Sequence, residues 1–155
     1  MVRYAIKLLM IWLFSMLAGC ISGLAPERII KINIKANEQL NSYLGVESNP
    51  VFIQVLQLKN VDSFQDLDFT RLYNDPAKAL GEGMVYLAPP FPVKPGEIIT
   101  KIIKPEADAR FIGLLYFFND FEKATTRHWF PVRTDKKQCL NLFLNNTLAV
   151  MEKCS

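Results

Sequence analysis

The side chains that could perform chemistry are few in this chain of 155 residues. One histidine, His128, and three cysteines, Cys20, Cys139 and Cys154, are present. A cysteine nucleophile needs a neighbouring base, and the pairing that the sequence offers is Cys139 with His128. The two fall in different predicted strands, so the simpler interpretation is a strand histidine and a disulfide cysteine. A His/Cys metal site would use almost all of these residues, and we expect no metal and no cofactor.

Three acidic residues, Asp62, Asp66 and Asp68, lie close together in the sequence. A pair of carboxylates can hydrolyse glycosidic bonds as acid and base or nucleophile. These three fall in a segment with helix signals, where the helix dipole favours acids near the N-terminus. We therefore interpret them as helix-stabilising residues.

Composition and charge exclude further classes of protein. Half of the residues are apolar and 21% are charged, which predicts one globular domain. Of the 18 basic residues, Arg3 and Lys7 lie in the leader described next, and the remaining 16 nearly balance the 15 acidic ones. The longest basic run is Lys136–Lys137, so we expect no binding to nucleic acid.

The first twenty residues have the pattern of a secretion signal. Arg3 and Lys7 precede a dense apolar run over 8–17. An uncleaved membrane anchor is the rival interpretation, because no charge occurs from 8 to 26. Gly, Ser and Pro dilute the second half of that stretch, however, and a spanning helix needs about 20 predominantly apolar residues.

Leu17-Ala18-Gly19-Cys20 decides between the two, because it resembles a bacterial lipobox at all four positions. The resemblance predicts a signal peptide over 1–19, a lipidated tether over 20–27 that begins at Cys20, and a domain over 28–155. Several acyl chains on one cysteine make a lasting membrane anchor. The residue after the cysteine is Ile21 and not Asp, which by resemblance to lipoprotein sorting in two-membrane bacteria implies transfer to the outer membrane. We therefore expect an outer-membrane anchor with the domain facing the periplasm.

The mature domain reads as an all-β protein with a short helical insertion. Capping-box spacing from Ser63 to Asp66 predicts one helix, with Phe64, Leu67 and Leu72 buried. Asp75, Pro76 and Gly81 frame a second, over Ala77–Leu80. Strand patterns around this insertion, without βαβ alternation, predict a β-sandwich. They cover 30–36, 51–58, 84–88, 97–103, 111–118, 129–134, 139–144 and 147–153.

The connection over 37–50 is long for a loop between strands, and such loops are often functional. It contains Leu40, Tyr43, Leu44 and Val46, which are too many apolar residues for a plain solvated spacer. Burying them all would require the loop to fold back over a sheet. Left in water, they would form an interface patch.

An ordered set of short motifs carries a family resemblance. It comprises Asn49-Pro50-Val51 with the strand through Gln57-Leu58-Lys59, then Phe64, Phe69, Leu72-Tyr73, Leu80-Gly81, Pro95-Gly96, Phe111-Ile112-Gly113 and Trp129. With the lipobox, this set resembles the TssJ (SciN/VasD) outer-membrane lipoproteins of type VI secretion systems. The family usually has Tyr at position 56 and Arg at position 130, where this chain has Leu56 and Phe130.

The resemblance implies a transthyretin-like two-sheet sandwich that is not an enzyme. It implies a structural component of the secretion membrane complex, which binds the periplasmic C-terminal region of TssM. The loop over 37–50 would be a main contact. The contact residues we expect there are Leu40, Asn41, Tyr43, Leu44, Val46 and Glu47.

Two other functions stay open at this point. A periplasmic lipoprotein that binds a lipid or sugar would have a cavity of several hundred Å³ lined by Tyr116, Phe117 or Trp129. A redox or hydrolytic enzyme would depend on Cys139. The leading interpretation requires no small-molecule substrate.

Cys139 and Cys154 are predicted to form a disulfide in the oxidising periplasm, because acylation of Cys20 leaves them as a pair. They flank a hairpin for which Asn145-Asn146 suits a type I′ turn. A symmetric register about that turn places Cys139 opposite Glu152. The bond would then require a bulge or a frayed end.

Overall fold

The alternating pattern at 30–36 forms a strand between two others. In the computed structural model, which describes residues 27–42, 47–133 and 137–155, β1 (Ile30–Ala36) pairs antiparallel with β5 (Ile98–Ile103) and parallel with β8 (Gln138–Asn145). Ile30, Ile32 and Ile34 are each 1% exposed and face the core. The alternating residues between them face outward, so this sheet has one buried and one open side.

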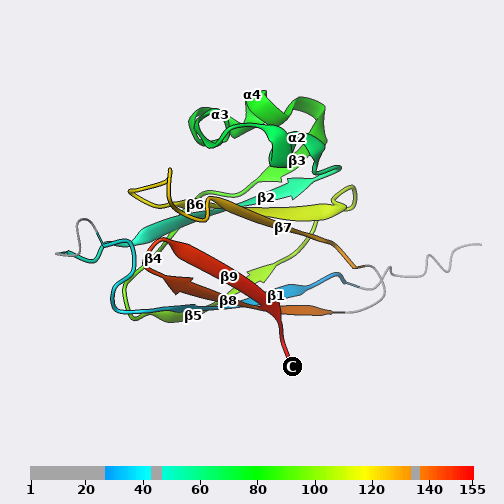
Figure 1. Ribbon diagram of the computed structural model, residues 1–155. Coiled ribbons are helices and arrows are strands. Elements are labelled where there is room, and N and C mark those ends of the chain that lie inside the picture. The colour runs from blue at the N-terminus through cyan, green and yellow to red at the C-terminus, as the bar shows by residue number, and fades with distance from the viewer. Residues whose placement is uncertain (1–26, 43–46, 134–136) are drawn as a thin grey trace, which may run out of the picture.

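Two sheets stack face to face and enclose the main core (Figure 1). Within the described residues, one sheet has the strand order β5-β1-β8-β9, and the other has β3-β2-β6-β7 with β4 beside β2. The predicted two-sheet sandwich is therefore confirmed. The remaining strands are β2 (Val51–Leu58), β3 (Met84–Leu87), β4 (Phe91–Val93), β6 (Phe111–Phe117), β7 (Arg127–Pro131) and β9 (Leu148–Lys153).

β2 is central, as its nearly continuous apolar sequence predicted. Ile53 and Val55 belong to the core between the sheets. Leu56 and Leu58 belong to a second cluster, beneath the helical insertion. Apart from Phe52, which is 45% exposed, the residues of β2 are buried on both faces of the sheet, which explains why polar and apolar residues do not alternate along the strand.

The helical insertion covers the outer face of the second sheet (Figure 1) and differs from the predicted helices. The predicted capping box at Ser63 and Asp66 is wrong, because no side chain caps α2 (Asp62–Asp66) and the chain leaves the helix at Leu67. Asp68 instead caps a separate α3 (Phe69–Asn74) by accepting a hydrogen bond from the Arg71 amide at 3.0 Å.

The predicted signals of the second short helix are confirmed. Asp75 caps α4 (Pro76–Leu80) through the amide of Lys78 at 3.0 Å, and Pro76 starts the helix. Gly81 follows with a φ of 51° and opens the 3-10 turn η2 (Gly81–Gly83). Within the described parts of the chain, none of the helices combines the length and apolar character needed to cross a bilayer.

The strand patterns in the sequence did not predict β4, which contains Pro92. β4 pairs with the first half of β2, with Val93 opposite Val51. Proline donates no backbone hydrogen bond, so it is tolerated in a short strand at a sheet edge. Read from sequence alone, the prolines around β4 indicated only turns.

Neighbouring aromatic residues at the end of β6 point to opposite sides, as their alternation predicted. Phe118 is buried in the core between the sheets. Phe117 faces the insertion, where its ring centroid lies 5.1 Å from that of Tyr73 and 6.3 Å from that of Phe69.

Candidate partner-binding site

The loop over 37–50 folds partly into its own domain. Leu40 is 0% exposed and packs in the core between the sheets, so its predicted place in an exposed patch is wrong. Asn41 is also buried, so the prediction that it contacts a partner is wrong as well. Glu47 is exposed, whereas Tyr43, Leu44 and Val46 lie outside the described residues.

Asn41 holds the base of this loop against two other segments. Its side-chain amide donates to the Pro50 carbonyl at 3.0 Å, and its Oδ1 accepts from the Asn119 amide at 2.8 Å. Its backbone amide donates to the carbonyl of Asn146 at 2.8 Å. The φ of Asn41 is 51°, a left-handed conformation that Asn tolerates better than most residues. The loop is thus fastened to the end of β6 and to the β8–β9 turn.

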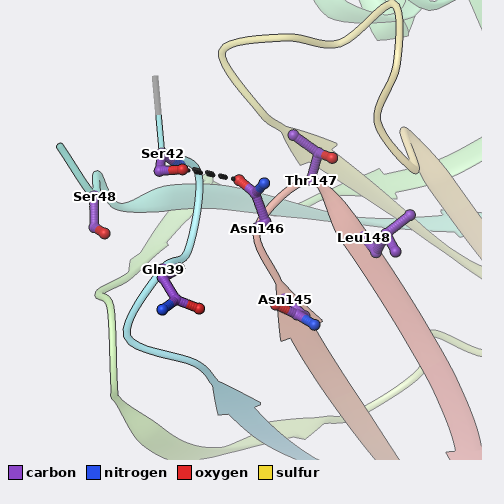
Figure 2. Close-up of a pocket in the computed structure, with 7 residues that line it drawn as sticks. All are labelled: Gln39, Ser42, Ser48, Asn145, Asn146, Thr147 and Leu148. Carbon is purple, nitrogen blue, oxygen red and sulfur yellow. Dashed lines mark hydrogen bonds between the residues drawn. The ribbon is translucent and has the colours of Figure 1, made fainter. Parts of the chain in front are cut away.

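Two further contacts close the loop at its base. The Asn49 amide donates to the Leu40 carbonyl at 3.1 Å. The Ser42 hydroxyl bonds to Oδ1 of Asn146 at 3.2 Å (Figure 2). The asparagines are the signal that could have revealed this arrangement, because their side chains imitate backbone groups at turns.

A hollow of about 450 Å³ lies between the loop and the β8–β9 turn (Figure 2). The described residues that line it include no Asp, Glu, Lys, Arg or His. Among the described residues, the side chains of Ser48 and Thr147 have no hydrogen-bond partner, so they are free to bond to another molecule. The lining residues are Gln39, Ser42, Ser48, Asn145, Asn146, Thr147 and Leu148.

Of the three aromatic residues, any of which could line the cavity of a ligand-binding lipoprotein, Phe117 lines a hollow, whereas Tyr116 and Trp129 lie elsewhere. Tyr116 is buried in the core, and its hydroxyl lies 3.0 Å from Nδ1 of His128. Trp129 lies on the edge strand β7 and packs edge-on against Phe111 at 5.7 Å between centroids. Phe117 lines a separate open hollow of about 420 Å³ with aromatic residues of the insertion and the loop after β6.

Cys139 and His128 do not form a nucleophile and base either. Cys139 lies on β8 in one sheet and is bonded to Cys154, while His128 lies on β7 in the other sheet. Burial lowers the pKa of His128 and raises that of Tyr116. The hydrogen bond between the Tyr116 hydroxyl and Nδ1 of His128 has a structural role, because it pairs two polar groups that lie partly inside the protein.

The register of the last hairpin differs from the predicted one by one residue. Asn145 pairs with Leu148, so the turn residues are Asn146 and Thr147. This shift places Cys139 opposite Cys154, with their Cα atoms 5.4 Å apart. The expected bulge is therefore unnecessary.

Acidic and metal-ligating side chains form no site in the described segments. There, no three His, Cys, Asp or Glu side chains gather in a way that could hold a metal ion. Asp68 acts as a helix cap, and Asp62 lies in the first turn of α2. The features that remain for function are the loop base, its hollow and the exposed surfaces around it.

A model of the type VI secretion lipoprotein family, described as T6SS-SciN with VasD, EvfM and TssJ, matches residues 28–147. The chain belongs to this family. The predicted family resemblance is thereby confirmed, and the protein is a lipoprotein component of type VI secretion. No curated protein sequence gives a significant match.

Solved structures of the type VI secretion lipoprotein family share this fold. TssJ1 from Pseudomonas aeruginosa is 21% identical with a TM-score of 0.78, over 84% of this chain and 98% of that one. Lip from Serratia marcescens, a membrane-bound component of the type VI secretion system, is 22% identical with a TM-score of 0.74, over 83% and 99%. A chain in the structure of the TssM C-terminal domain from EAEC is 19% identical with a TM-score of 0.65, over 82% and 99%.

Proposed function

We propose that this protein is anchored by lipid to the periplasmic face of the outer membrane and binds the periplasmic C-terminal region of TssM. It would be a structural link in the type VI secretion membrane complex and not an enzyme. Membership of the type VI secretion lipoprotein family supports the general role. The division into signal peptide 1–19, tether 20–27 and domain 28–155 is part of the same proposal.

The pairing of the cysteines supports Cys20 as the lipid site. Cys139 and Cys154 are bonded to each other, which leaves Cys20 of the three cysteines in the chain. Cys20 ends the lipobox-like motif, and a lipoprotein needs one free thiol to acylate. Ile21 in place of Asp supports the outer membrane as the destination.

The observation that carries partner binding is the way the loop over 37–50 is built. Leu40 and Asn41 fasten its base, so they support the loop rather than touch the partner. Tyr43, Leu44, Val46 and Glu47 remain as contact residues. A loop fixed at its base loses less conformational entropy when it binds, which favours affinity.

The test is a binding titration with the full-length lipidated protein in nanodiscs and the periplasmic C-terminal region of TssM. Tyr43→Ala with Leu44→Ala should weaken binding at least tenfold, about 1.4 kcal/mol, because aromatic anchors contribute strongly at interfaces. Tyr86→Ala is the control, because this tyrosine is also exposed but lies outside the loop, on edge strand β3 of the β3-β2-β6-β7 sheet.

A thermal melt of each variant separates loss of contact from loss of fold. The melting temperature should shift little in both variants. Unchanged affinity in the double variant would place the contact elsewhere, and a collapsed melt would mean that these residues are core.

A further inference from the structure

Large apolar side chains are exposed on the open face of the β5-β1-β8-β9 sheet. The helices cover the other sheet and leave this face bare (Figure 1). The exposed side chains there are Ile98, Ile102, Phe143, Leu148 and Val150. Exposed apolar groups that share one face indicate an interaction surface.

The register gathers four of these five side chains at one end of the face. Ile98 lies opposite Lys35, which lies opposite Phe143, which lies opposite Val150. Leu148 is the next outward residue along β9 from Val150. Ile98 is 72% exposed, Phe143 40%, Leu148 53% and Val150 50%. We call Ile98, Phe143, Leu148 and Val150 the apolar strip.

A polar row bounds the apolar strip. Thr100, Asn33, Asn141 and Glu152 lie opposite one another on the same face. The Thr100 hydroxyl bonds to Asn33 Oδ1 at 3.2 Å, and the Asn33 amide donates to Asn141 Oδ1 at 3.0 Å. Ile102 lies beyond this row, at the opposite end of β5. The polar row argues against a lipid surface, which would cover the whole face.

The apolar strip is continuous with the loop base. Leu148 lines the hollow together with Gln39, Ser42 and Ser48 of the loop (Figure 2). Lys35 is the last outward residue of β1 before the loop begins. A molecule bound at the loop base therefore reaches the strip without crossing the polar row.

We infer that the apolar strip is a second contact for the same partner that the loop binds, an inference that rests on the proposed function. The binding segment of that partner presents aliphatic side chains to the strip and a carboxylate to Lys35. Lys35 stands between Ile98 and Phe143 and has no ion pair among the described residues. Covering its ammonium group without an opposite charge would be unfavourable, which selects an acidic partner segment.

Val150→Lys and Ile102→Lys form a matched pair for the test. Both residues are β-branched, lie on edge strands of this face and are about half exposed, at 50% and 51%. We expect Val150→Lys to weaken binding of the TssM region to the full-length lipidated protein at least tenfold. Ile102→Lys should change it less than twofold, and Lys35→Glu should weaken it at least fivefold. Should Val150→Lys lower the melting temperature, Val150→Thr replaces it.

Each outcome supports or overturns the inference. Wild-type protein that does not bind the TssM region would refute the proposed function and this inference with it. Wild-type binding that both lysine variants retain would overturn the strip contact alone. If Ile102→Lys weakens binding of the TssM region as much as Val150→Lys does, the partner contact is not restricted to the apolar strip, and that part of the inference is overturned. If the wild-type protein forms oligomers and Val150→Lys lowers their mass without changing the affinity for the TssM region, the inference is overturned and the apolar strip is a contact with a second copy of this chain.

Discussion

The amide of Cys154 donates a hydrogen bond to the carbonyl of Cys139 at 3.2 Å, so the two residues joined by the disulfide are also directly paired in the sheet. The disulfide between Cys139 and Cys154 closes a loop with a sequence separation of 15 residues. Cys139→Ser with Cys154→Ser should therefore lower the free energy of unfolding by about 3 kcal/mol on the chain-entropy model. Urea denaturation measures this change. Two free thiols in the denatured, unreduced wild-type protein would contradict the bond.

Cys20→Ser should abolish labelling with a palmitate analogue in cells, because no other cysteine is free to be acylated. The Cys139→Ser and Cys154→Ser double variant is the control and should keep its label. In-gel fluorescence after metabolic labelling gives the comparison. Label that persists in Cys20→Ser would refute the proposed anchor.

Asn41→Ala should lower the free energy of unfolding by about 1–3 kcal/mol, because it removes two part-buried hydrogen bonds, one to the Pro50 carbonyl and one from the Asn119 amide. The φ of 51° adds to the cost, since alanine adopts it less readily. Gln39→Ala, an exposed change two residues away, should shift stability by less than about 0.5 kcal/mol. Equal stability of the two variants in urea would show that Asn41 does not hold the loop.

Gly113→Ala should destabilise the insertion on the second sheet by about 1–3 kcal/mol. A Cβ at this position would lie 2.9 Å from the ring of Phe64, which is fully buried under the insertion. Gly83→Ala is the matched control, because its Cβ would meet only ordinary contacts, the nearest at 3.5 Å from Asn60. Thermal melts of both variants test the difference, and a Gly113→Ala protein as stable as the wild type would show that Phe64 moves aside at little cost.

Acid should destabilise the wild-type protein through His128. Burial lowers the pKa of His128 in the folded state, while the unfolded chain keeps a value near 6.5. The unfolded state therefore binds more protons as the pH falls below about 6.5, and stability declines there. His128→Gln should flatten this decline between about pH 7.5 and 5.5. Parallel slopes in urea titrations of the two proteins would contradict the assignment.

Local patterns in the sequence determined much of this protein. The alternation over Ile30–Ala36, the continuous apolar run of Val51–Leu58 and the caps of α4 each depend on neighbours a few residues apart. The family resemblance has the same origin, because its motifs are short strands and turns in a characteristic order. The lipobox-like motif at Cys20 is local as well, and its function stays a prediction.

Only the tertiary structure decided the hairpin register, the burial of Leu40 and the role of Asn41. The register depends on which two residues form the turn. Moving the turn by one residue along the chain places Cys154 instead of Glu152 opposite Cys139. Asn41 meets Asn119 and Asn146, which are distant in sequence and come near it only when the two sheets close. Periodicity reports which face of a strand is buried, but contacts between distant segments depend on how the whole chain packs.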